Sequence, residues 1–305
     1  MTQPPGSNGN RDDLPLANPP QRVSGMRVPD GWRLPGKPAD LDPTAEDAWR
    51  QTGFLLGDDL RLAGENLELQ AALAKTGYTP SARTMIMAGF ASLWSRGFLS
   101  TSDALGLARR GSYQAALALV RQAIECVGAQ MNLEHELDAW RRWTHEAYGR
   151  DDASHAVEIG VGHYFGGESI ARDEHLRVMY RAVSDFSRPN FGPTALFAAA
   201  DANHERYPLV FADQAFHLGW AQLVLGWALR LGVIQLHAAM HLSQHFPAGA
   251  ELRDRIVAHV AAVEALLAAP DRCRVEELAD DEGRRRHLVV EFRRRAADAP
   301  RRLLL

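Results

Sequence analysis

Residues Arg109 to Trp143 read RRGSYQAALALVRQAIECVGAQMNLEHELDAWRRW, and this stretch decides the fold. Gly111 and Ser112 interrupt an apolar helical pattern, and we expect a second helix to begin after them. Apolar side chains then recur from Tyr113 to Val127 with a period of about 3.6 residues. Because its apolar character is nearly all-round, this helix is predicted to be central and covered on several sides.

A charged pair lies inside this predicted central helix. Arg121 and Glu125 are four residues apart, and therefore share one helix face. Such a pair in an apolar helix is either a buried ion pair or part of a polar pocket. If it mainly organises the core, loss of one partner would cost about 3–5 kcal/mol.

Length and composition favour an ordinary globular protein. The 305 residues are 46% hydrophobic and 24% charged, and the net charge of −4 gives no global basic field of the kind that announces nucleic-acid binding. Two distant cysteines, Cys126 and Cys273, indicate no disulfide framework, so we expect a reducing cytoplasm. No uninterrupted apolar run approaches about 18 residues, so we expect no transmembrane helix.

Three segments are predicted. Residues 1–43 hold nine of the sixteen prolines and are interpreted as a disordered or extended segment, from which Trp32 and Leu34 could tuck against the domain. Residues 44–270 are predicted to form a single multi-helix bundle of the all-α class. Residues 271–305 are interpreted as a charged, marginally helical tail, because no alternating strand pattern longer than a few residues is found.

Caps and breakers divide the bundle into successive helices. The predicted helices begin near 43, 59, 80, 100, 113, 132, 152, 169, 193, 209 and 250, and the last of them ends near 268. Gly77 is predicted to stop the second, Thr79-Pro80-Ser81 to open the third, and the polar residues 100–103 to cap the fourth. The helix that begins at Ser169 is predicted to run to about Phe186. The glycines from Gly160 to Gly167 lack the Lys-Ser/Thr of a phosphate loop and are interpreted as a simple loop.

A second polar stretch runs from Tyr180 to Asn190. Tyr180 and Ser184 share a helix face, and Pro189 stops the helix, which leaves four polar groups near its end: Ser184, Asp185, Arg188 and Asn190. These groups either make local hydrogen bonds at a helix terminus or meet Arg121 and Glu125 in one polar cleft.

These two stretches together resemble a known group. Ala115-Ala116-Leu117-x-x-x-Arg121-x-x-x-Glu125, followed 55 residues later by Tyr180-x-x-Val183-Ser184-x-Phe186-x-x-Pro189, is similar to the HEPN superfamily and its poorly characterised bacterial relatives. The resemblance covers about residues 83 to 245. Arg188 stands where a His is usual in that group. The resemblance implies a helical bundle and a link to RNA or to phage defence.

The ribonuclease members of that group use an Arg that is followed, after four to six residues, by a His. Of the three such pairs in this chain, Arg230 and His237 alone lie on the predicted long helix. The resemblance therefore implies Arg230 as a charge stabiliser and His237 as a general acid/base. The missing His at position 188 weakens this transfer of catalysis.

A histidine stripe supports a different chemistry. His237, His241 and His245 recur every four residues, and two histidines so spaced can hold a metal ion if a further ligand comes from elsewhere. No Glu lies between them as in the HExxH motif, so an interfacial polar stripe is the simpler interpretation.

Three functions of different classes follow. The first is a non-enzymatic protein that binds a ligand or partner through a cleft around Arg121, Glu125, Tyr180 and Ser184. The second is an HEPN-type ribonuclease that uses Arg230 and His237, and the third is a metalloenzyme that uses the histidine stripe. We rank the binding protein first, expect no cofactor and no membrane, and leave open an RNA partner, a protein partner and a homodimer.

Overall fold

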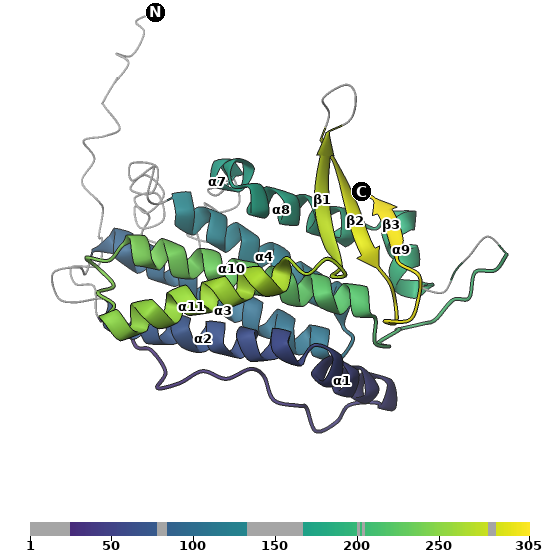
Figure 1. The fold of residues 1–305 in the computed structure, drawn as a ribbon, viewed down its shortest axis with the longest axis horizontal. Coiled ribbons are helices and arrows are strands. Elements are labelled where there is room, and N and C mark those ends of the chain that lie inside the picture. The colour runs from purple at the N-terminus through teal and green to yellow at the C-terminus, as the bar shows by residue number, and fades with distance from the viewer. Residues whose placement is uncertain (1–24, 78–83, 133–166, 200–201, 203–204, 280–284) are drawn as a thin grey trace, which may run out of the picture.

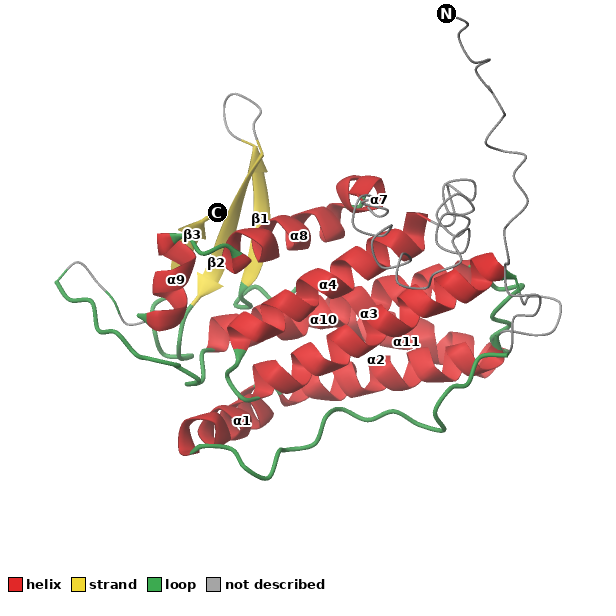
Figure 2. Cartoon of the chain, turned by 180° about the vertical axis from the view of Figure 1, so that it is seen from behind, coloured by secondary structure: helices red, strands yellow, loops and turns green. Residues whose placement is uncertain are grey.

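The computed structural model describes residues 25–77, 84–132, 167–199, 202, 205–279 and 285–305. These residues form an elongated helical bundle with a small antiparallel sheet at one end, as Figures 1 and 2 show from opposite sides. The predicted helical bundle is therefore confirmed. The prediction of an all-α protein is wrong at the C-terminal end of the chain.

The first helix begins, and the second ends, where the sequence predicts. Helix α1 (Pro43–Leu55) follows Asp42, whose Oδ1 accepts hydrogen bonds from the backbone N–H groups of Thr44 at 2.8 Å and Ala45 at 3.1 Å. Helix α2 (Gly57–Thr76) ends at Gly77, as predicted from the sequence. Residues 78–83, which include the predicted cap at Thr79-Pro80-Ser81, lie outside the described residues.

Helix α3 (Met85–Arg109) joins two helices that the sequence predicted as separate. The polar residues near position 100 were interpreted as a cap cluster. In the structure the Thr101 hydroxyl donates a hydrogen bond to the carbonyl oxygen of Gly97 at 2.8 Å, within the helix. Their polar groups are satisfied without a break, so the helix continues.

Helix α10 (Leu218–His241) lies at the centre of the bundle. It packs against α2, α3, α11 (Ala250–Leu267) and α4 (Tyr113–Asn132), and 18 of its 24 residues are buried. This helix is long and apolar enough to cross a membrane, and 83% of its most apolar window is buried inside the protein. The same composition is expected of a helix at the centre of a bundle. Helix α4 is covered by α3, α8 and α10, as expected for an apolar helix.

A break divides the predicted helix from Ser169 to Phe186. Helix α7 (Gly167–Arg172) ends before Asp173, whose Oδ1 accepts the N–H of Leu176 at 2.8 Å and so caps helix α8 (Glu174–Ser187). Helix α9 (Phe191–Ala198) follows, and both α7 and α8 pack against α4. This arrangement places the polar stretch of α8 over the charged pair of α4.

The C-terminal tail forms strands and not a helix. Strands β1 (Arg274–Ala279), β2 (Arg285–Phe292) and β3 (Arg301–Leu304) pair antiparallel in that order, with Glu277 opposite His287. The charged residues of the tail hid the strand pattern of a short apolar run, Leu288 to Val290, in β2. Val289 and Phe292 of this strand are only 0% and 3% exposed. Burial of this run against the bundle overrides the weak helical tendency of the tail.

Residues 25–42 take an extended path along the outside of the bundle before α1 (Figure 1). Trp32 donates its indole N–H to Ser102 Oγ at 3.3 Å, and the Leu34 side chain packs over Gly64 in α2. Arg109 donates to the carbonyl oxygen of Pro35 at 2.9 Å. The two apolar residues singled out in this segment thus pack against the bundle.

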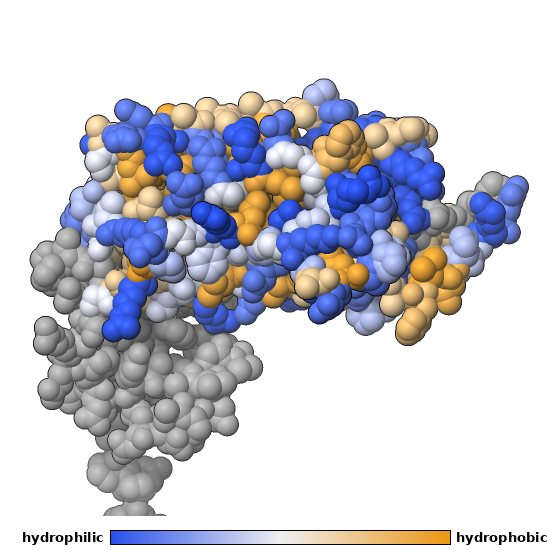
Figure 3. Space-filling view, turned by 90° about the horizontal axis from the view of Figure 1, so that it is seen from below, coloured by the Kyte–Doolittle hydropathy of each residue, from blue (hydrophilic) through white to orange (hydrophobic). Residues whose placement is uncertain are grey.

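Apolar side chains are exposed at the end of the molecule that carries α9 and the loop after it. Phe191 is 78% exposed, Leu209 is 70% exposed and Phe211 is 97% exposed. Figure 3 shows a group of apolar side chains at this end, whereas polar side chains cover much of the remaining face.

Candidate functional site

A cleft of about 430 Å³ lies between α4, α7 and α8. We call it the arginine cleft, because four arginines line it. Its lining residues are Arg121, Gly167, Ile170, Ala171, Arg177, Tyr180, Arg181, Ser184 and Arg188.

The charged pair of α4 lies at one side of the arginine cleft. Arg121 Nε is 3.4 Å from Glu125 Oε1, and the pair is bridged by Tyr180, whose hydroxyl oxygen is 3.5 Å from both Arg121 Nη2 and Glu125 Oε1. The Arg121 guanidinium also lies 5.6 Å from the centre of the Tyr180 ring, within range of a cation–π contact. The structure therefore brings these three predicted residues together.

The pair is not the buried ion pair that would organise the core. The side chains of Arg121 and Glu125 are 41% and 38% exposed. Solvent screens an ion pair this open, so its contribution to stability is expected to be below about 1 kcal/mol. The expected cost of 3–5 kcal/mol is wrong for this pair, because that figure requires full burial. The polar-pocket interpretation fits its position.

Two further arginines share one carboxylate on α8. Asp185 Oδ2 is 3.1 Å from Arg181 Nε, and Asp185 Oδ1 is 3.5 Å from Arg188 Nη1. The Asp185 side chain is 15% exposed, whereas the two arginine side chains are 53% and 56% exposed. Each guanidinium carries five N–H donors, so both arginines keep donors for another acceptor.

Ser184 contributes a hydroxyl without a partner among the described residues. The residue is 8% exposed, lines the cleft, and its Oγ makes no hydrogen bond there. A helical serine usually bonds back to the carbonyl four residues earlier, as Ser187 does to Val183 at 2.6 Å. A buried hydroxyl left unpaired is costly, so an acceptor or donor from a bound molecule or water is expected to satisfy it.

The charges of the cleft do not cancel. Four guanidiniums line it, and the carboxylates that contact them are Glu125, Asp185 and Glu277. The hydrogen bonds from Arg177 lower the pKa of Glu277 below its usual value, so this carboxylate is ionised at neutral pH. Among these groups of the described residues, one positive charge therefore remains in excess, which favours an anionic ligand.

The cleft is lined by four of the seven predicted residues, and two unpredicted arginines line it as well. Glu125 and Asp185 are outside the lining and pair with arginines that belong to it. Asn190 is exposed at the N-cap position of α9 and does not line the cleft. Sequence reasoning missed Arg177 and Arg181. The signal was present, because positions 177, 181 and 188 are spaced by four and seven residues and so recur on one helix face.

The ribonuclease pair has a different setting. Arg230 forms a two-pronged ion pair with Glu264 of α11, in which Nη2 is 2.8 Å from Oε2, and its side chain is only 14% exposed. Partial burial and the neighbouring His241 lower the pKa of His237, so its imidazole is neutral at pH 7 and able to accept a proton. The guanidinium expected to stabilise charge is already bound to a carboxylate.

The histidine stripe does not continue along one helix. Helix α10 ends at His241, and His245 lies in the turn that follows. Within the described ranges, no group of three His, Cys, Asp or Glu side chains is placed to hold a metal ion. The metalloenzyme hypothesis therefore gains no support from this part of the chain.

Comparison with known proteins adds no assignment. No protein-family model, curated protein or solved structure matches this chain. The resemblance to the HEPN superfamily thus stays a prediction from short motifs, and the argument for function rests on the arginine cleft.

Proposed function

We propose that this protein binds a small anionic ligand, of the kind that carries a phosphate group, in the arginine cleft. One observation carries the proposal: four arginines line the same cleft as Ser184, a buried serine whose hydroxyl has no partner among the described residues. Arginine suits this ligand class, because its planar donors match the oxygens of a phosphate in pairs.

The arrangement favours binding over catalysis. The polar side chains around the cleft are arginines, their paired carboxylates, Tyr180 and Ser184. Among the residues that the structure describes, no histidine or cysteine lines it that could activate a nucleophile or transfer a proton near neutral pH. The proposed role is therefore that of a binding protein, in agreement with the function ranked first from the sequence.

Calorimetric titration with inorganic phosphate and pyrophosphate, at matched ionic strength, tests the proposal. Arg121→Gln removes one cleft cation and is expected to weaken binding about tenfold, which corresponds to about 1.4 kcal/mol. Ser184→Ala is expected to weaken it by a smaller factor, because one neutral hydrogen bond is worth about 1 kcal/mol.

Arg172→Gln provides the matched control. Arg172 is an exposed arginine of α7 that pairs with Glu168 at 2.8 Å and does not line the cleft. This variant carries the same charge change and is expected to bind like the unmodified protein. Absence of binding at millimolar phosphate, or equal losses in Arg121→Gln and Arg172→Gln, would refute a site in the cleft.

The ribonuclease hypothesis makes a separate prediction. It requires that the purified protein cleave RNA and that cleavage disappear in His237→Ala while phosphate binding is retained. Cleavage with that dependence would place the activity at α10. It would leave the arginine cleft as a second site.

A further inference from the structure

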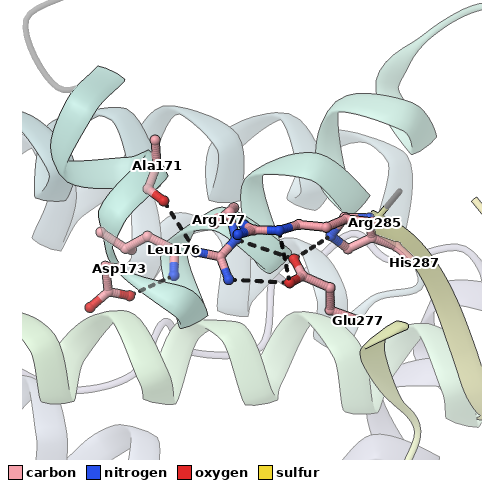
Figure 4. Close-up of polar contacts among 7 residues, drawn as sticks. All are labelled: Ala171, Asp173, Leu176, Arg177, Glu277, Arg285 and His287. Atoms are coloured by element: carbon pink, nitrogen blue, oxygen red, sulfur yellow. Dashed lines mark hydrogen bonds and ion pairs between the residues drawn. The ribbon is translucent and has the colours of Figure 1, made fainter. Parts of the chain in front are cut away.

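Glu277 of β1 is surrounded by two arginines and a histidine from two elements. Arg177 of α8 binds it with two hydrogen bonds, from Nε to Oε2 at 3.2 Å and from Nη2 to Oε1 at 3.3 Å. From β2, Arg285 Nε lies 3.7 Å from Oε1 and His287 Nε2 lies 3.4 Å from Oε2. Figure 4 shows the carboxylate between Arg177 on one side and Arg285 and His287 on the other.

Arg177 lies at the boundary between the arginine cleft and the sheet. Its Nη1 donates to the carbonyl oxygen of Ala171 at 3.1 Å, and both of these residues line the cleft. Its Nε and Nη2 point instead to Glu277, as Figure 4 shows. One guanidinium thus serves both the cleft and the hairpin formed by β1 and β2.

The base of this hairpin is held firmly to the bundle. Arg272, just before β1, forms a buried ion pair with Asp59 of α2, in which the side chains are 5% and 4% exposed. The N–H of Cys273 donates to Gln222 of α10 at 3.0 Å, and Phe292 is buried at the end of β2. These contacts do not involve α8.

The outer part of the hairpin is held differently. A hollow of about 500 Å³ separates α8 from much of β1, and Leu278 is 45% exposed. Two hydrogen bonds from Arg177 to Glu277 join α8 to the hairpin. This ion pair is therefore a direct polar attachment of the outer hairpin to α8.

We propose that Glu277 is an internal competitor for the anionic ligand of the arginine cleft. An oxyanion that binds Arg177 from the cleft takes the place of the Glu277 carboxylate, and the outer hairpin separates from α8. Glu277 keeps Arg285 as an ionic partner on its own sheet, so it leaves α8 without becoming an unpaired charge. Docking of the hairpin and occupation of the cleft then oppose each other.

This inference rests on the proposed anion binding, and it adds a reciprocal coupling to it. A contact that weakens ligand binding must itself be weakened by the ligand to the same extent. Removal of the Glu277 charge should therefore strengthen binding of phosphate. Binding of phosphate should in turn loosen the outer hairpin.

Glu277→Gln tests the first half, because the amide has the shape of the carboxylate without its charge. Calorimetric titration with inorganic phosphate is expected to show affinity increased roughly fivefold, within the usual range of allosteric coupling. Glu276→Gln is the matched control. Glu276 is the preceding residue of β1, and its carboxylate pairs with Arg274 at 2.6 Å. This control is expected to leave the affinity unchanged.

Hydrogen–deuterium exchange on the unmodified full chain tests the second half. Saturating phosphate is expected to speed exchange of amides in 274–279 and 285–288, and to leave the buried amides of α10 unchanged. This measurement does not depend on whether any variant folds.

The outcomes separate the two proposals. If phosphate binds, but Glu277→Gln and Glu276→Gln have equal affinities and hairpin exchange does not change, the competition is overturned and the binding function stands. If neither the unmodified protein nor Glu277→Gln binds phosphate or pyrophosphate, both proposals fail. If only Glu277→Gln binds, the competition is supported in its strongest form.

Discussion

Two arginine–carboxylate pairs in this protein have the same chemistry and different surroundings. Arg121 and Glu125 lie four residues apart on one helix at the edge of the arginine cleft, and their side chains are 41% and 38% exposed. Arg272 and Asp59 are 213 residues apart in the sequence, and their side chains are 5% and 4% exposed. The Arg121–Glu125 pair, which the sequence predicted, is exposed to solvent. The Arg272–Asp59 pair is buried and joins two segments that are distant in the sequence.

The comparison shows that burial determines whether an ion pair can exchange partners with a ligand. Water screens an exposed pair, so its residues are free to exchange partners with a ligand. A buried pair has lost its hydration, and each charge then depends on the other and on nearby dipoles. Arg272 also donates to the carbonyl of Gln222 at 3.0 Å, which ties α2, α10 and the start of the sheet together. The first pair suits a binding site, and the second suits an architectural tie.

The largest effect is expected at the buried pair. Arg272→Met leaves the Asp59 carboxylate buried without its partner, and should lower the free energy of unfolding by about 3–5 kcal/mol. Urea denaturation followed by circular dichroism measures this change. Adding Asp59→Leu removes the stranded charge and should restore much of the loss. A single variant as stable as the unmodified protein would show that the pair does not hold the base of the sheet.

A smaller effect on stability is expected at His259, a buried neutral imidazole that lies next to the Glu65 carboxylate. His259 of α11 is 2% exposed, with Nε2 at 3.1 Å from Asn66 Nδ2 and Nδ1 at 3.3 Å from Glu65 Oε2. Burial lowers the pKa of His259, against the opposing effect of Glu65. Because the unfolded chain binds the proton more tightly, stability is full above the unfolded pKa of about 6.5 and is lost as the pH falls below it.

His259→Gln checks this pH dependence. The variant should lose about 1 kcal/mol at pH 8, where a buried hydrogen bond is disturbed, and lose less on acidification than the unmodified protein. The pKa of His287 is also lowered, chiefly by burial, so part of the acid sensitivity should remain. Free energies of unfolding measured from pH 8 to pH 5 give both results. Parallel curves for the two proteins would contradict a role for His259.

The smallest change in stability is expected at the exposed pair. Arg121→Gln should alter the free energy of unfolding by less than about 1 kcal/mol, because solvent already screens the charge. The same variant is expected to weaken phosphate binding about tenfold, so stability and affinity should separate. A loss of several kcal/mol would instead return Arg121 to the role of a core-organising residue.

Much of the helical bundle could be predicted because its signals are local. The Pro43-Thr44 start of α1, the Gly77 stop of α2 and the apolar period of α4 each act within a few residues. The break at Asp173 was missed, since an aspartate inside a helical pattern does not announce that its side chain will cap a new helix. The sheet was missed because charged residues surround its short apolar run.

The candidate site was partly foreseen for the same reason. Spacing within α4 and within α8 put Arg121 with Glu125, and Tyr180 with Ser184, on single helix faces. Spacing places Arg177 and Arg181 on one face of α8, but it could not show that this face would line the cleft or that Asn190 would lie apart. Those positions depend on how α8 crosses α4, which is set by packing between helices.

The sequence by itself determined a helical bundle with an apolar central region and polar groups confined to particular faces of α4 and α8. Period and capping suffice for this, because each acts over one or two turns. The tertiary structure decided which charged pair is buried, because Arg272 meets Asp59 only after the chain has folded. It also decided that Arg177 joins the arginine cleft to Glu277, since that contact requires α8 and the sheet to lie side by side.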